Sequence, residues 1–140
     1  MIRLASKFDN KKIRDLFIDF NDKHNLSISS NEMKWDIVFF ENQLAKIYAG
    51  LGFILIDEDF TGVMCILKTP SFWIPDTFIL QESMWHGKTD KVSIELLKAY
   101  IKIGTEMKEK REITEFHFSS FSNANFEKFG AKKLTHGWVI

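Results

Sequence analysis

The sequence predicts a single domain of mixed α/β (α+β) class spanning residues 1–140. In some stretches apolar residues recur every three or four positions and in others at every second position, which is typical of helices interspersed with strands. Hydrophobic residues make up 45% of the chain and charged residues 27%, a balance that suits a soluble globular domain with a sizeable core. No proline-rich linker, low-complexity stretch or internal repeat divides the chain.

The apolar spacing and the turn residues place ten elements along the chain. They are a strand over 1–5, helices over 10–24 (capped by Asp9 or Asn10) and 31–44 (capped by Ser29 or Ser30), strands over 45–57, 61–72 and 76–85, a helix over 91–110, a strand over 113–119, a short helix over 122–131 and a strand over 132–140.

The two helices of the first half each show one apolar face, formed by Ile13, Leu16, Phe17 and Phe20 in the first and by Met33, Ile37, Phe40 and Leu44 in the second. The runs over 45–57 and 61–72 are joined closely enough to pair as an antiparallel hairpin. Pro70 and Pro75 mark the next turn, before the strand over 76–85.

The second half combines one long helix with short elements. The helix over 91–110 has a continuous apolar face, and Thr89 or Asp90 is its expected cap. Residues 113–119 alternate in the manner of a half-buried strand. Gly130 stops the short helix after residue 122, because glycine takes the left-handed conformation most easily.

Charge and cysteine content exclude several classes of function. Nineteen basic and nineteen acidic residues give a formal net charge of zero, so neither nucleic acid nor an anionic membrane is an expected partner. Cys65 is the sole cysteine, which excludes an internal disulfide and a cysteine-rich zinc site and favours a cytoplasmic location. No apolar run approaches the roughly 18 residues of a membrane span, and we expect neither export nor anchoring.

The order of elements, the long helix after the fourth strand and the ending "NFEKFGAKKLTHGWVI" resemble the Gcn5-related N-acetyltransferases. In that family the closing segment commonly reads tyrosine, glutamate, lysine or arginine, leucine, glycine and phenylalanine, and then a strand; "FEKFGA", from Phe126 to Ala131, is similar to it. The resemblance covers essentially the whole chain. It implies a mostly antiparallel central sheet with helices on both faces, in which the fourth and fifth strands are parallel and splay apart.

The resemblance also implies acetyl-coenzyme A as co-substrate, held where those two strands part and at the N-terminus of the long helix, whose N–H groups and dipole attract a pyrophosphate. The family's loop reads glutamine or arginine, two variable residues, glycine, a variable residue, and glycine or alanine. Registering on Leu96 and Leu97 puts Lys88, Lys91 and Ser93 at its three defined positions. The implied cofactor-binding residues are Met84, Trp85, Lys88, Thr89, Asp90, Lys91, Val92, Ser93 and Phe126.

Two other interpretations of this loop bear on the assignment. An alternative register takes His86 and Gly87 as the basic residue and the glycine, and the sequence leaves both registers open. The letters "GKT" also suggest the phosphate loop of nucleotide hydrolases, but that loop requires a glycine five positions before Gly87, where Glu82 stands. Nucleotide hydrolysis is therefore not expected.

Acetyl transfer to an amine requires a base that takes a proton from the amine. Glu82 on the fourth strand is the expected base, acting directly or through a water. The alternative is a solvent-facing strand glutamate. The family's usual acid is the tyrosine that opens the closing motif, and Phe126 at that position has no proton to donate. Many members carry asparagine where this chain has Ser119, and alanine where it has Ser122.

Histidines and tryptophans give weaker signals. His117 falls on the same strand face as Glu115 and could line the slot beside Glu82. No two histidines have the i, i+4 spacing of a helical metal site, so no metal is expected. The four tryptophans are expected in the core or along the slot rather than as a base-stacking platform.

The resemblance thus implies an enzyme that transfers an acetyl group from acetyl-coenzyme A to a primary amine of a small molecule or a protein, by direct attack in a ternary complex. The alternatives are a catalytically inactive binding or interaction module of the same fold, with or without coenzyme A binding, and a domain with no ligand. The apolar turn "TPSFWIPD" is open to three interpretations: a wall of the acceptor pocket, a homodimer contact or a packed turn.

Overall fold

A computed structural model describes residues 1–24, 36–120 and 124–134 of the chain. In chain order its elements are β1 (Ile2–Leu4), η1 (Lys7–Asp9), α1 (Asn10–His24), α2 (Ile37–Lys46), η3 (Ile47–Leu51), β2 (Gly52–Asp57), β3 (Gly62–Pro70), β4 (Phe78–Gly87), α3 (Asp90–Glu109), β5 (Glu115–His117) and η4 (Glu127–Phe129). Among these described segments no helix is long and apolar enough to cross a membrane.

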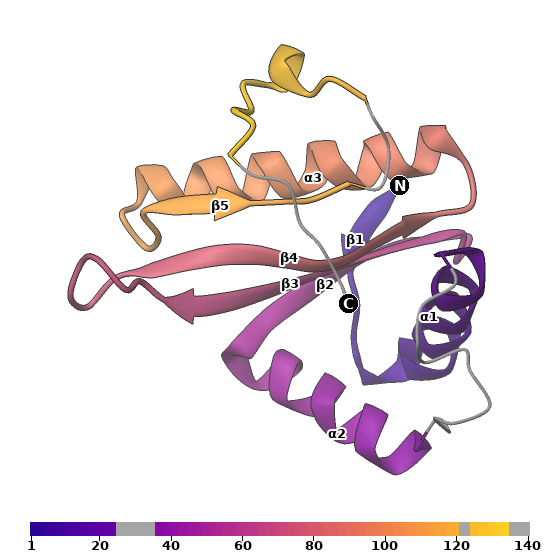
Figure 1. Cartoon of the computed structure of the whole chain (residues 1–140). Helices are drawn as coiled ribbons and strands as arrows, with labels where there is room; N and C mark the ends of the chain where they lie inside the picture. Colours follow the sequence, from indigo (N-terminus) through magenta and orange to yellow (C-terminus); the bar gives the residue numbers. More distant parts are fainter. Residues whose placement is uncertain (25–35, 121–123, 135–140) are drawn as a thin grey trace.

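The elements form three layers around one sheet (Figure 1). The five strands lie in the order β1-β2-β3-β4-β5. Helices α1 and α2 cover one face of the sheet and α3 covers the other (Figure 1). Neighbouring strands are antiparallel except β4 and β5, which are parallel, with Leu80 opposite Phe116. The predicted fold class, with helices on both faces and a parallel fourth and fifth strand, is confirmed.

Two cores result, one on each face. The core under α1 and α2 contains Ile13, Leu16, Phe20, Phe40, Leu44, Ile47, Ile54, Ile56, Val63, Cys65 and Met84. The core under α3 contains Leu55, Met64, Ile66, Leu80, Leu96, Leu97, Tyr100 and Ile113. The apolar positions that predicted the helix over 10–24 are the residues that α1 buries, which is why that prediction succeeded.

The caps of the first two helices differ from expectation. Neither Asp9 nor Asn10 is the cap: the helical run begins one turn earlier, at η1, and the Asp9 carboxylate accepts a hydrogen bond of 2.9 Å from the Ser6 backbone N–H. At α2 the N-cap is Asp36, whose carboxylate accepts from the Phe39 N–H at 2.9 Å. The expected caps Ser29 and Ser30 lie outside the described residues.

The strand expected over 45–57 begins only at Gly52, and the prediction is wrong for residues 45–51. Ile47 follows Leu44 by three positions and both are buried, so the apolar face of α2 continues into a π-type turn. Gly50, with φ of 122°, then adopts a conformation that ends the helix.

The remaining strands and the long helix match the prediction closely. β2 and β3 form the expected antiparallel hairpin, and α3 is capped by Thr89. β4 extends two residues further than predicted, to Gly87, whereas β5 is shorter than predicted.

At the closing segment the short helix is a single 3-10 turn, η4, and Gly130 ends it with φ of 81° as expected. Residues 132–134 are not a strand, and the rest of the strand predicted over 132–140 lies outside the described residues.

Candidate functional site

A bulge in β4 divides the strand into two halves that face differently. Consecutive residues of β3 pair with Glu82 and Met84, which leaves Ser83 as an extra residue between them. Leu80 therefore belongs to the core under α3, and Met84 to the core under α1 and α2. Glu82 lies opposite Ile66, on the α3 face.

The two parallel strands part beside this bulge. β5 pairs with β4 only from Ile79 to Gln81, and β4 then continues to Gly87 with β3 as its only partner among the described strands. Glu82 is the first residue of β4 beyond the paired stretch. The residue predicted as the base thus lies where the splay begins.

Glu82 is buried, with only 7% of its surface exposed. Its Oε2 accepts hydrogen bonds from the Ser119 N–H at 3.0 Å and the Ser119 hydroxyl at 2.8 Å. Burial raises the pKa of the Glu82 carboxyl, and the two bonds from Ser119 oppose that rise. The alternative of a solvent-facing strand glutamate is therefore wrong.

Tyr100 connects α3 to the same region. Its hydroxyl donates to the His117 carbonyl at 2.8 Å, at the last residue of β5. Burial and the Glu82 charge raise the pKa of Tyr100. His117 itself projects from the face opposite to Phe116, which packs against Tyr100 under α3. Strand alternation thus puts His117 and Glu82 on opposite faces of the sheet.

The N-terminus of α3 follows β4 after a tight turn. The Thr89 hydroxyl accepts from the Val92 N–H at 3.3 Å, and the Thr89 carbonyl accepts from the Ser93 N–H at 3.1 Å. Lys88 and Lys91 are exposed on this turn. Asp90 is exposed too, whereas Val92 and Ser93 are half-buried.

The alternative register of this loop would require His86 to face the turn before α3. His86 is only 4% exposed, and its Nε2 lies 2.6 Å from the Asp19 carboxylate of α1. Its ring also packs edge-on against Phe20. The His86 side chain thus packs on the face under α1, whereas Lys88 and Lys91 are the basic residues exposed at the turn before α3.

Four aromatic rings pack together where the far half of β4 has no β5 partner. Trp85 of β4 contacts Phe118 at a centroid distance of 6.0 Å and Phe126 at 5.9 Å. Phe126 in turn contacts Phe118 at 5.3 Å and Phe129 at 6.5 Å. We call Trp85, Phe118, Phe126 and Phe129 the aromatic cluster; it bridges β4 and the segment after β5.

The residues predicted to bind the cofactor therefore fall into three groups. Trp85 and Phe126 lie in the aromatic cluster, and the Trp85 indole also donates to the Ser93 carbonyl at 3.1 Å. Met84 is buried in the core under α1 and α2, so only its backbone faces the region where β4 and β5 part. The third group is the turn and first helical residues, Lys88, Thr89, Asp90, Lys91, Val92 and Ser93.

Sequence reasoning identified Ser119 only as a substitution and missed its contact with Glu82. The two residues are 37 positions apart, so no local pattern reports their hydrogen bonds. Two cavities of about 320 and 420 Å³ lie along β1, and among the described residues neither is lined by Glu82 or by the start of α3.

No protein-family model and no curated protein sequence matches the chain. Solved structures do resemble it. An acetyltransferase of Trypanosoma brucei superposes with a TM-score of 0.70 at 12% identity, covering 100% of this chain and 97% of the other. The ribosomal-protein-alanine N-acetyltransferase of Brucella melitensis biovar Abortus 2308 gives 0.65 at 14% identity, covering 100% and 98%. A transcriptional regulator of Bacillus halodurans C-125 gives 0.69 at 12% identity, covering 100% and 97%.

These likenesses concern the backbone, because so few residues are identical. They extend over the full length of the chain, in which β4 and β5 form a parallel pair within an otherwise antiparallel sheet. The fold that the closing segment and the element order suggested is thereby confirmed: the chain has the fold of the Gcn5-related N-acetyltransferases.

Proposed function

We propose that this chain is an N-acetyltransferase that takes the acetyl group of acetyl-coenzyme A and passes it to a primary amine by direct attack in a ternary complex. The observation that carries the proposal is the buried Glu82 carboxyl at the point where β4 and β5 part. A carboxyl whose pKa is raised toward neutrality is better matched to taking a proton from an amine than an ordinary exposed one. Solvent is also excluded from around it.

The chain's own residues fit the parts of this reaction. The bound thioester would supply an activated acetyl group, whose C–S bond breaks as the amine bonds to the carbonyl carbon, with the coenzyme A thiolate as leaving group. Glu82 would take the proton that the amine loses, while Ser119 holds the carboxylate through Oε2. Lys88, Lys91 and the N-terminus of α3 would hold the pyrophosphate, since the helix dipole and two exposed cations favour an anion there.

A second candidate function is a catalytically inactive module of the same fold, and the aromatic cluster favours it. Trp85, Phe118 and Phe126 pack together against the core under α3, beside the stretch of β4 that has no β5 partner among the described strands, and there they would obstruct a pantetheine arm. Phe126 also stands where the family has its usual acid. Under this second hypothesis the aromatic cluster stabilises the diverging strands by itself, and no thioester binds beside them.

Calorimetric titration with acetyl-coenzyme A separates the two. The enzyme hypothesis predicts binding that Lys88→Glu weakens at least about tenfold, since it replaces an attraction by a repulsion at the pyrophosphate. Lys98→Glu is the matched control, because Lys98 is exposed on the same helix further from its N-terminus. Absence of binding by the unmodified chain at millimolar cofactor would favour the module.

Thiol release with a panel of primary amines then tests the base. Glu82→Gln keeps an oxygen to accept from Ser119 but cannot take a proton, so kcat/KM should fall by about 10² to 10⁴ while cofactor binding persists. An unchanged kcat/KM would remove Glu82 from the mechanism.

A further inference from the structure

Among the described residues, no strand pairs with the outer edge of β1. β1 is the edge of the sheet that these residues form, and the backbones of Met1 and Ala5 bond to the β2 side at 3.2 and 2.8 Å. Because inward and outward backbone groups alternate along an antiparallel strand, those of Ile2 and Leu4 point away from β2. This edge therefore has the hydrogen-bonding groups that another strand would need.

Arg3 restricts which of these groups a partner can use. Its guanidinium donates to the Leu4 carbonyl at 3.2 Å and is held by two bonds of 2.9 Å to the Asp9 carboxylate. The remaining outward groups are the N–H and C=O of Ile2 and the N–H of Leu4. A short edge covered at one end favours one register over open-ended strand pairing.

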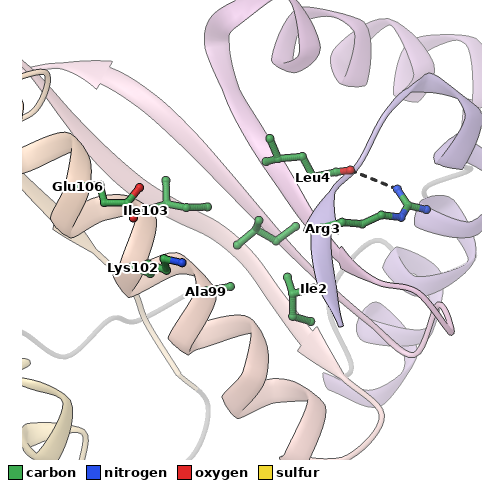
Figure 2. Close-up of a pocket in the computed structure, with 8 residues that line it drawn as sticks. Ile2, Arg3, Leu4, Ala99, Lys102, Ile103 and Glu106 are labelled. Atoms are coloured by element: carbon green, nitrogen blue, oxygen red, sulfur yellow. Dashed lines mark hydrogen bonds between the residues drawn. The ribbon is translucent and has the colours of Figure 1, made fainter.

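Two cavities adjoin along this edge and share Leu4, which is 59% exposed. The first lies between β1 and α3, and Figure 2 shows Ile2 and Leu4 facing Lys102 and Ile103 across it. The second continues past the end of β1 to Lys7 and Tyr48. We call Ile2, Leu4, Lys102, Ile103, Lys7 and Tyr48 the β1-edge groove.

We propose that the β1-edge groove binds an extended peptide segment of another protein, which adds as a strand beside β1. The outward backbone groups select an extended chain, and the apolar side chains of Ile2, Leu4 and Ile103 select apolar side chains on it. β1 spans only Ile2–Leu4, so about three residues of the peptide would pair with it, ~10 Å at ~3.3 Å per residue, and the flanking residues of the peptide would lie over the two cavities.

The charged side chains along the β1-edge groove indicate which residues the bound peptide would carry. Arg3 is already paired with Asp9. The remaining cations are Lys7 at one cavity, whose ammonium lies 5.3 Å from the centroid of the exposed Phe8 ring, and Lys102 at the other, partly offset by Glu106. A segment with an apolar centre and acidic residues on both sides is complementary to this arrangement. The groove lies away from Glu82, so the proposal does not rest on the proposed transfer reaction.

The test uses the full chain and a fluorescein-labelled peptide, Glu-Val-Leu-Val-Glu, titrated by fluorescence anisotropy. Leu4→Pro removes the outward N–H without touching the bonds to β2, whereas the matched Leu4→Ala keeps that N–H and loses the same side chain. We expect Leu4→Pro to bind at least about tenfold more weakly than Leu4→Ala. Should Leu4→Pro fail to fold, a peptide N-methylated at alternate residues removes the same hydrogen bonds from the ligand side.

The charge argument is tested with Lys102→Glu, which should weaken binding of the acidic peptide and strengthen binding of the counterpart Lys-Val-Leu-Val-Lys. Lys98→Glu, on the same helix but outside the groove, is the control and should change neither. Three results would overturn the proposal: no binding of the acidic peptide by the unmodified chain, equal binding by Leu4→Pro and Leu4→Ala, or a dimer in sedimentation that Leu4→Pro dissociates, which would assign the edge to a second copy of the chain.

Discussion

At the scale of single residues, the pairing of Glu82 with Ser119 decides the chemistry of the candidate site. The carboxyl is buried, which disfavours its charge, and it is stabilised by two bonds from one serine, which favour its charge. The balance leaves the pKa above its ordinary value. A base of this kind must lose its proton to act, so the proposed activity should rise with pH through that raised pKa.

Ser119→Ala tests this balance, because it deletes the hydroxyl bond and keeps the backbone one. The carboxylate loses a donor, the pKa of Glu82 rises further, and the acidic limb of the kcat/KM profile should move to higher pH. Activity at a fixed pH on that limb falls accordingly. Ser119→Thr retains a hydroxyl, so its acidic limb should lie at the same pH as in the unmodified protein. If the acidic limb does not move in Ser119→Ala, Glu82 is not the titrating group.

At the scale of elements, the start of the first helical run depends on one carboxylate. Asp9 accepts from the Ser6 N–H and from the Arg3 guanidinium, which links η1 to β1. Those bonds, with that from Arg3 the strongest, hold the pKa of Asp9 below its usual value. The stability they give is present above the ordinary pKa near 3.8 and is lost as pH falls through the lowered one.

Asp9→Asn should therefore lower the free energy of unfolding by about 1 kcal/mol at pH 7, because it weakens the capping-box bond to the Ser6 N–H and the ion pair with Arg3. Below the lowered pKa the two proteins should converge, since the native Asp9 is then uncharged as well. Urea denaturation at pH 7 and at a series of progressively lower pH values measures the difference. Asp22→Asn, exposed on α1, is the control, and an equal loss for it would contradict a special role for Asp9.

The contact of α3 with β5 depends on a close approach at Gly104. A Cβ built there would lie 2.7 Å from the Phe116 ring, within the core under α3. Gly104→Ala should gain about 1 kcal/mol in helix propensity but lose more through overpacking, for a net loss of about 1–2 kcal/mol. Pairing it with Phe116→Leu should recover part of that loss in thermal unfolding; a stabilised single variant would contradict the contact.

These elements show what the sequence could predict. The helices over 10–24 and 91–110 were found because their buried faces repeat locally. Residues 45–51 were misassigned because Ile47 can continue either a helix face or a strand pattern. The bulge at Ser83 and the bonds from Ser119 to Glu82 depend on pairings between distant segments, so no local spacing could reveal them.

At the scale of the whole molecule, one sheet holds both cores together. Neighbouring residues of β2 supply opposite faces, with Ile54 and Ile56 under α1 and α2 and Leu55 under α3. The candidate site lies at the β4 and β5 end of the sheet, and the β1-edge groove lies at the other. A substitution that destabilises either core should therefore destabilise every strand of the sheet.

This arrangement predicts that the chain unfolds as one cooperative unit, as a single domain over residues 1–140 should. Leu44→Ala opens the core under α1 and α2, and Leu97→Ala opens the core under α3; each removes a side chain that is at most 1% exposed and should cost about 2–5 kcal/mol. Because both cores share the sheet, each variant should shift one common transition.

Circular dichroism, tryptophan fluorescence and calorimetry should then report a single midpoint, and the calorimetric and van't Hoff enthalpies should agree. If Leu97→Ala instead separated a first transition confined to α3 from a second one, the two faces would be independent folding units and the single-domain description would fail.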